Sequence, residues 1–115
     1  MRKVILLALI IAIAIQFVPV KMENPPHIAP SLPEKVLKIL KKGCYDCHSN
    51  TTRWPWYSRI APISWLIAND VTEGREELNF SRWNSMNERT KKKKIREIWE
   101  EVSEGEMPPL LYSVM

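Results

Sequence analysis

Both cysteines of this 115-residue chain and one of its two histidines lie together in the stretch Cys44-Tyr45-Asp46-Cys47-His48. Such residues can form a redox-active dithiol, half of a zinc site, a structural disulfide, or the attachment point of a covalent haem. For a haem, two thiols three positions apart on a tight turn can each bond a vinyl group on one edge of the porphyrin. The imidazole of His48 is then held under the ring, where its neutral nitrogen can bind the iron. The spacing therefore favours one haem c, covalently bound through Cys44 and Cys47, with His48 as the proximal metal ligand.

Three alternatives to a haem remain open. A redox dithiol of the thioredoxin type is expected next to a βαβ unit, and the chain has no strand pattern. A structural zinc ion needs four ligands, so His48 and His27 would have to complete the set, and His27 lies in a proline-rich segment. A plain disulfide suits an exported protein but gives His48 no role.

A second axial ligand for the iron is expected from Met107. Methionine opposite histidine is the ligand pair of electron-carrying cytochromes. Met107 follows a predicted helix and precedes two prolines, so its backbone is stiff, and it lies far enough from the cysteines to reach the opposite haem face. The alternatives are His27 as the second ligand, or an open site with Met107 serving only as packing.

Aromatic residues are concentrated after the motif. The candidates to line a haem pocket are Trp54, Trp56, Tyr57 and Trp65. Of these, Trp56 or Tyr57 is the expected donor to a haem propionate, through its N–H or O–H group, although packing in a core would explain them equally well. Arg53 and Arg59 are candidate partners for the propionates.

The motif must be positioned by helices. Ser31 is a good N-cap, with Pro33 and Glu34 in the first turn, so a helix is predicted to begin there and to end at Gly43, just before the motif. Its apolar stripe is Val36, Ile39 and Leu40.

Two further helices are predicted after the aromatic loop. Pro62 can start one, which Gly74 is expected to end or interrupt, and the last runs from Glu88 to Glu104 with Gly105 as its cap. Their apolar positions are Ile63, Leu66, Ile67 and Val71 in the first, and Ile95, Ile98, Trp99 and Val102 in the second. The predicted fold class is all-α.

The N-terminal segment has a different character. A basic start, Arg2-Lys3, is followed by an uncharged apolar run over residues 4–20, broken only by Gln16. This pattern is typical of a secretory signal or of an uncleaved anchor. Cleavage at the small-x-small site, Ala12-Ile13-Ala14, would leave a very short apolar region, so an anchor is favoured.

The domain organisation follows from this pattern. We predict a membrane anchor or signal segment at residues 1–21, a tether at 22–30 and a haem-binding domain at 31–115. The positive residues are expected to keep the N-terminus inside, so that the domain faces the periplasmic or extracytoplasmic side. The membrane is then one partner of the chain.

Charge and residue types exclude several functions. The net charge of +4 includes the two basic residues of the apolar segment, and the basic run at 91–94 is followed by glutamates, which is typical of a solvated helix face and not of nucleic-acid binding. No acid–base pair or nucleophile triad is visible, so the chain is not expected to be an enzyme of the hydrolase or transferase type.

Longer stretches carry a family resemblance. "GCYDCHSNTTRWPWYSRIAPISWLIANDVTEGREELNFSRW", together with "VSEGEMP", resembles the small membrane-anchored, mono-haem, cytochrome-c-like haem-binding domains. The resemblance implies a small cytochrome-c-like helical domain around one covalent haem c on Cys44 and Cys47. It also implies iron bound by His48, with Met107 as the distal ligand. This ligand pair predicts a membrane-tethered electron-transfer cytochrome with an unidentified redox partner protein. Alternatives are a haem-based sensor or peroxidase-like protein with an open distal site, and a haem-free disulfide module.

One departure from this family concerns the C-terminus. Related proteins continue into a terminal helix that packs on the first helix of the domain, whereas this chain stops soon after Met107. Either the helix ending at Glu104 takes over that packing, or the sequence is truncated.

Overall fold

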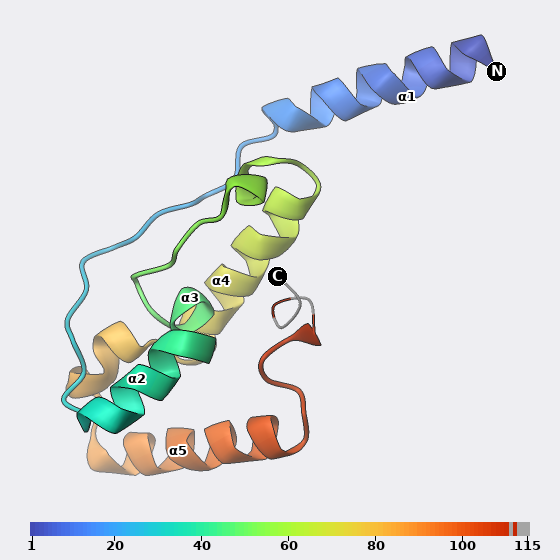
Figure 1. Cartoon of the computed structure of the whole chain (residues 1–115). Helices are drawn as coiled ribbons and strands as arrows, with labels where there is room; N and C mark the ends of the chain where they lie inside the picture. Colours follow the sequence, from blue (N-terminus) through green and yellow to red (C-terminus); the bar gives the residue numbers. More distant parts are fainter. Residues whose placement is uncertain (111, 113–115) are drawn as a thin grey trace.

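Helices form the regular structure of the chain, which the computed structural model describes for residues 1–110 and 112 (Figure 1). The α-helices are α1 (Arg2–Ala14), α2 (Glu34–Gly43), α3 (Tyr45–His48), α4 (Ile63–Glu77) and α5 (Glu88–Ser103). Short 3-10 helices are η1 (Ile15–Phe17), η2 (Trp56–Arg59) and η3 (Phe80–Ser85). No strand occurs in the described residues, and the predicted all-α class is confirmed.

α2 begins later than predicted. Its N-cap residue is Pro33, and no side chain caps it. The backbone N–H of Ser31 instead donates to Oδ1 of Asn84 at 2.7 Å, which ties this residue to η3. The predicted N-cap at Ser31 was therefore wrong, because a tertiary contact holds Ser31 outside the helix. The predicted end at Gly43 is confirmed.

The apolar stripe of α2 is only partly used. Leu40 is buried, but Val36 and Ile39 are exposed in the described chain. Leu40 packs with four other buried residues, of which one is in the motif and three follow α4, namely Tyr45, Leu78, Phe80 and Trp83. The Tyr45 and Phe80 rings are stacked with centroids 5.7 Å apart. This small core lies directly behind the cysteine turn.

α4 does not end at Gly74, contrary to the prediction, and continues to Glu77. Gly74 is buried, and a Cβ atom built on it would lie 2.6 Å from the backbone oxygen of Cys47. Real Cβ atoms essentially never approach so closely. The glycine therefore allows α4 to pack against α3 and is not a helix terminator.

α5 begins at Glu88 as predicted and is followed by the predicted Gly105, but it buries little surface. Oδ1 of Asn87 accepts a hydrogen bond from the N–H of Thr90 at 2.8 Å, and Gly105 after the helix has a φ of 79°. Ile98 packs against the core. The remaining apolar residues of the predicted face, Ile95, Trp99 and Val102, are exposed. α5 thus joins, through Ile98, the core that contains Leu40 of α2.

α1 projects from the rest of the molecule (Figure 1). It has 13 residues, none of them buried, so at a rise of about 1.5 Å per residue it is about 20 Å long. Among the described residues, no helix combines the length and hydropathy needed to cross a bilayer.

The segment at 22–30, predicted as a tether, lies along the domain. The Asn24 side chain donates to the Thr52 carbonyl at 2.9 Å, and the Asn50 side chain donates to the Pro26 carbonyl at 2.8 Å. Further along, His27 Nδ1 and Ser81 Oγ are 2.7 Å apart. We call this segment the strap. Side chains of the domain hold it at several points along its length.

Candidate haem site

The cysteine motif forms a single helical turn. Cys44 ends α2 and precedes α3, and its carbonyl accepts the backbone N–H of His48 at 2.8 Å. α4 packs closely against the backbone of Cys47 at Gly74 and so helps to hold this turn in place. The local fold therefore gives both thiols and the imidazole a fixed place on one turn.

The ring of His48 is oriented by the end of α4. Its Nδ1 lies 2.9 Å from the carbonyl oxygen of Leu78. A carbonyl can only accept, so Nδ1 must carry the proton, and in the neutral ring the lone pair is on Nε2. Metal-binding histidines commonly hold their second nitrogen in this way. Sequence reasoning assigned His48 as the iron ligand but had no means of finding its hydrogen-bond partner 30 residues away.

Neither cysteine has the properties of a reactive thiolate. Both are free and half-buried. Burial raises the pKa of Cys44, and burial together with the charges of Asp70 and Asp46 raises the pKa of Cys47 to about 11. Redox dithiols depend on a lowered thiol pKa. These environments argue against the redox-dithiol alternative.

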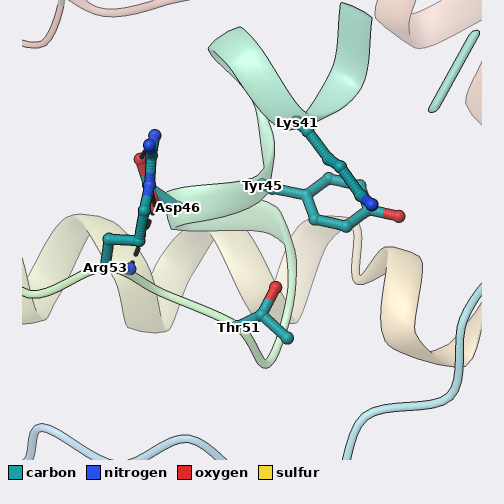
Figure 2. Close-up of a pocket in the computed structure, with 5 residues that line it drawn as sticks. All are labelled: Lys41, Tyr45, Asp46, Thr51 and Arg53. Carbon is teal, nitrogen blue, oxygen red and sulfur yellow. Dashed lines mark hydrogen bonds and ion pairs between the residues drawn. The ribbon is translucent and has the colours of Figure 1, made fainter. Parts of the chain in front are cut away.

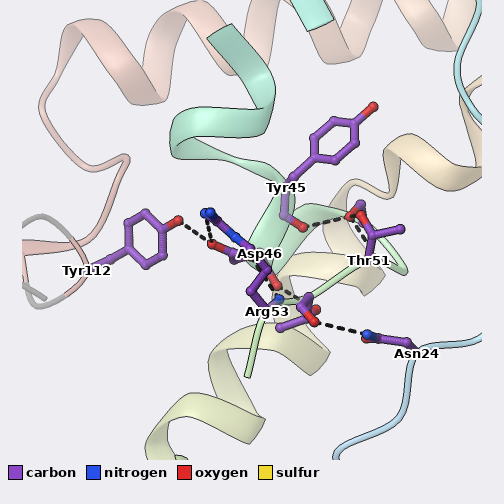
Figure 3. A network of polar contacts seen from close by, with 8 residues as sticks. Asn24, Tyr45, Asp46, Thr51, Arg53 and Tyr112 are labelled. Atoms are coloured by element: carbon purple, nitrogen blue, oxygen red, sulfur yellow. Dashed lines mark hydrogen bonds and ion pairs between the residues drawn. The ribbon is translucent and has the colours of Figure 1, made fainter. Parts of the chain in front are cut away.

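Asp46, between the cysteines, joins the turn to two distant segments (Figure 3). Its Oδ2 accepts from Arg53 Nη2 at 2.9 Å and from the Tyr112 hydroxyl at 2.6 Å, and its Oδ1 accepts from the Arg53 backbone N–H at 3.0 Å. Burial alone would raise the pKa of Asp46, but the hydrogen bonds from Arg53 and Tyr112 outweigh it and lower that pKa. Arg53, a predicted propionate partner, is thus paired within the chain.

A pocket of about 450 Å³ opens beside this turn. Its volume lies within the range of about 300–1,000 Å³ typical of small-molecule sites. The wall residues include Cys47, Trp54, Tyr57, Ile67, Val71 and Tyr112. A second pocket, of about 230 Å³, shares Asp46 and Arg53 with it and is smaller than that range (Figure 2).

One indole group of this pocket fits a carboxylate of a haem, whereas Trp65, the other predicted lining residue with a buried N–H, is not in the pocket wall. The N–H groups of Trp54 and Trp65 are buried without a hydrogen-bond partner in the described structure. Buried donors are normally satisfied. Trp54 lines the larger pocket, so a propionate there could accept its hydrogen bond. Of the three predicted haem-binding residues of the motif, Cys47 lines this pocket, whereas Cys44 and His48 lie on the same turn outside its wall. Two thiols and an oriented imidazole on one turn, with Cys47 at the pocket, fit a haem by their chemistry.

The predicted aromatic residues separate into two groups. Tyr57 is in the pocket wall. Trp56 does not line the pocket, because its side chain points outward from η2 and is 76% exposed. Its ring centroid lies 5.6 Å from that of Tyr57. Trp54 instead occupies the place that was expected of Trp56, in the pocket wall and with a buried indole N–H that has no partner in the described structure. The sequence had indicated Trp54 only as one of several lining residues.

Met107 lies in the extended segment after α5. Its backbone N–H donates to the Glu101 carbonyl at 3.2 Å, and the residue is 37% exposed. It is not part of the wall of the larger pocket. Five residues later, Tyr112 is in that wall and bonds to Asp46. The segment that carries the methionine is therefore attached to the cysteine turn at its far end.

His27 has a role of its own. It bonds to Ser81 and meets the Tyr45 ring edge-on, with centroids 6.3 Å apart. In residues 1–110 and 112, no three His, Cys, Asp or Glu side chains form a group that could hold a metal ion. The zinc alternative therefore has no ligand cluster to support it.

Sequence reasoning missed several residues that build the site. Tyr45 was assigned no chemistry and is the central ring of the core, while Asp46 is the hub of the polar network. Arg75 and Tyr112 make the long-range bonds that hold other segments to the motif. Their partners lie 23 to 66 residues away, so no local pattern in the sequence indicates them.

The motif supplies two thiols and an imidazole, and Cys47 connects this turn to the larger pocket. A family model described as a haem-binding domain matches residues 10–115. The chain therefore belongs to this haem-binding family, as its sequence resemblance suggested. No curated protein and no solved structure matches it.

Proposed function

We propose that this haem-binding domain carries one haem c, bound covalently through Cys44 and Cys47, and that it acts as an electron-transfer cytochrome. The orientation of His48 carries the proposal. Its Nδ1 is engaged by the Leu78 carbonyl at 2.9 Å, which leaves Nε2 free as an iron ligand. When bound, the haem supplies one-electron chemistry of its iron.

The chain's own residues would hold and insulate the haem. The Cys44 and Cys47 thiols attach it, and the indole N–H of Trp54 is available for a propionate. Ile67 and Val71 give the pocket an apolar wall from α4. Burial of the iron in such surroundings is one of the factors that set its potential.

Met107 is proposed as the second axial ligand. Support comes from the attachment of its segment at both sides, by its own backbone to Glu101 and by Tyr112 to Asp46. A thioether and an imidazole together raise the potential of the iron and are the ligand pair of electron-carrying cytochromes. The exposure of Met107 and its place outside the pocket wall favour a second candidate, a sensor or peroxidase-like protein with an open distal site.

We further propose that the domain is exported and tethered at a membrane by its apolar N-terminal segment. The support is the exposure of the apolar side chains of α1, which have no packing partner in the domain. Burial of such side chains in lipid would be favourable.

The decisive experiment uses the full chain made in a host with cytochrome-maturation machinery. After denaturation and extraction with acidified organic solvent, haem should remain with the polypeptide. The double variant Cys44→Ser/Cys47→Ser should lose it. If wild-type haem is extracted, covalent attachment is disproved. A reduced spectrum unchanged by carbon monoxide supports the electron carrier, and ready binding of the gas supports the open-site candidate.

A further inference from the structure

The end of the domain next to α1 exposes three large apolar side chains. These are Trp56 of η2, Ile60 just after it, and Ile63 at the start of α4, and we call them the apical patch. Trp56 is 76% exposed, and Ile60 and Ile63 are each over 40% exposed. None of the three belongs to the wall of the larger pocket. Their exposure is therefore unrelated to that pocket.

Gln16 joins this end of the domain to the N-terminal helix. Its side chain makes two reciprocal hydrogen bonds with the backbone of Ala61, donating to the carbonyl at 3.1 Å and accepting from the N–H at 3.0 Å. Ala61 lies between Ile60 and Ile63. Gln16 is the one polar residue in the apolar run 4–20, and this pairing explains its presence there.

Exposed apolar side chains lie on both sides of this junction. Phe17 and Val18, directly after Gln16, are exposed, and so are the apolar side chains of α1 that precede it. Arg59 lies in the sequence between Trp56 and Ile60 and is exposed. A tryptophan and an arginine bordering an apolar segment are typical of the boundary between lipid tails and headgroups.

We propose that the apical patch is a lipid-contacting surface, so that the domain rests on the bilayer in which α1 is inserted. This inference depends on the proposed membrane tethering. The patch residues, Trp56, Ile60 and Ile63, lie at the interface between lipid tails and headgroups, and Arg59 binds lipid phosphates. The Gln16–Ala61 pairing sets the orientation, because it prevents the domain from turning away from the helix that anchors it.

The chain contains a matched control for this surface. Trp99 on α5 is 72% exposed, nearly as much as Trp56. It lies on the helix farthest from α1 in Figure 1. A lipid surface at the apical patch would therefore contact Trp56 and leave Trp99 in water.

The test uses the full haem-loaded chain in phosphatidylcholine–phosphatidylglycerol vesicles with brominated or ordinary acyl chains. For each protein, the ratio of tryptophan fluorescence in the two lipids gives quenching by bromine and cancels quenching by the haem. Wild type and Trp99→Phe should show strong quenching, and Trp56→Phe should lose most of it. Gln16→Leu should lower quenching while the protein still sediments with the vesicles.

Other results overturn the proposal in distinguishable ways. If the wild type does not sediment with vesicles, the membrane tether fails and the patch with it, whereas covalent haem attachment is unaffected. If it sediments but Trp56→Phe is quenched as strongly as wild type, the tether stands and the apical patch does not contact lipid. Equal loss in Trp56→Phe and Trp99→Phe would likewise contradict a surface confined to this end.

Discussion

At the scale of single residues, His48 is positioned by a carbonyl group that no side-chain substitution can remove. The bond from Nδ1 to Leu78 fixes which ring nitrogen is available, and Leu78 itself is held in place because it is buried in the aromatic core. The imidazole is thus aligned before any iron binds. Such preparation reduces the entropy lost when a ligand site is completed.

We predict that His48→Ala will separate attachment from ligation. The thiols of Cys44 and Cys47 remain, so haem should still be bound covalently, but its iron loses the proximal ligand. The Leu78 carbonyl also loses its donor, at a cost of about 1–3 kcal/mol in the free energy of unfolding. Absorbance of the reduced protein and urea unfolding measure the two effects. An unchanged spectrum would show that His48 does not bind the iron.

Tyr112 is expected to position the methionine segment through Asp46. In Tyr112→Phe the ring remains but the 2.6 Å hydrogen bond is lost, so methionine ligation should weaken and carbon monoxide should bind more readily. Tyr57→Phe is the control, because Tyr57 lines the same pocket without bonding to Asp46. Equal carbon monoxide binding by Tyr112→Phe and wild type would contradict this role.

At the scale of elements, the contact between α3 and α4 depends on Gly74. In Gly74→Ala the new methyl group would meet the Cys47 backbone, 2.6 Å away in the present geometry, and the helices must separate. Such overpacking costs about 1–3 kcal/mol. We expect a lower unfolding midpoint and a smaller yield of attached haem.

Gly43 supplies the matched control. A Cβ atom built there meets nothing within 4 Å, and its φ is not positive. Gly43→Ala should therefore be neutral, or should stabilise the end of α2 by up to about 1 kcal/mol. If both alanine variants behave alike, the close approach at Gly74 has no energetic importance.

The existence and order of the helices could be predicted from the sequence, since apolar spacing and prolines are local signals. The same signals failed where contacts between distant segments decide the outcome. Ser31 is an N-cap by type but is held by Asn84, and Gly74 is a helix breaker by type but lies where two helices nearly touch. Of the site residues, the cysteine motif could be recognised from the sequence. The positions of Trp54 and Tyr112 in the pocket wall depend on how the loops fold, which local signals do not indicate.

At the scale of the whole molecule, Arg75 connects α4 to the strap and to the loop after His48. Its guanidinium donates to the Ser49 and Glu23 carbonyls, to Asn24 Oδ1 and to Thr52 Oγ1, at 2.7 to 2.9 Å. One side chain thus joins three segments. Burial lowers the pKa of this guanidinium, but from so high a value that it stays charged at physiological pH.

We predict that Arg75→Gln will release the strap. Loss of hydrogen bonds to a charged group should cost about 1.5–3 kcal/mol or more in unfolding free energy. Backbone amides of residues 23–29 should exchange faster with deuterated water. Arg82→Gln, at an exposed arginine whose side chain is not hydrogen-bonded in the described structure, should leave exchange unchanged. Protection of 23–29 that persists in Arg75→Gln would show that the strap is held by other bonds.

The hydrogen bonds that hold the strap on the domain also limit how far the haem can move from the membrane. A free, extended linker of nine residues would allow a domain to move up to about 30 Å from its anchor. The strap lacks this freedom because the domain binds it at Asn24, Pro26, His27 and Ala29. A domain so fastened cannot swing between a donor and an acceptor. If the protein is anchored as proposed, it can diffuse only within the membrane, and its electron donor and its electron acceptor must both reach the haem within one narrow layer above the lipid.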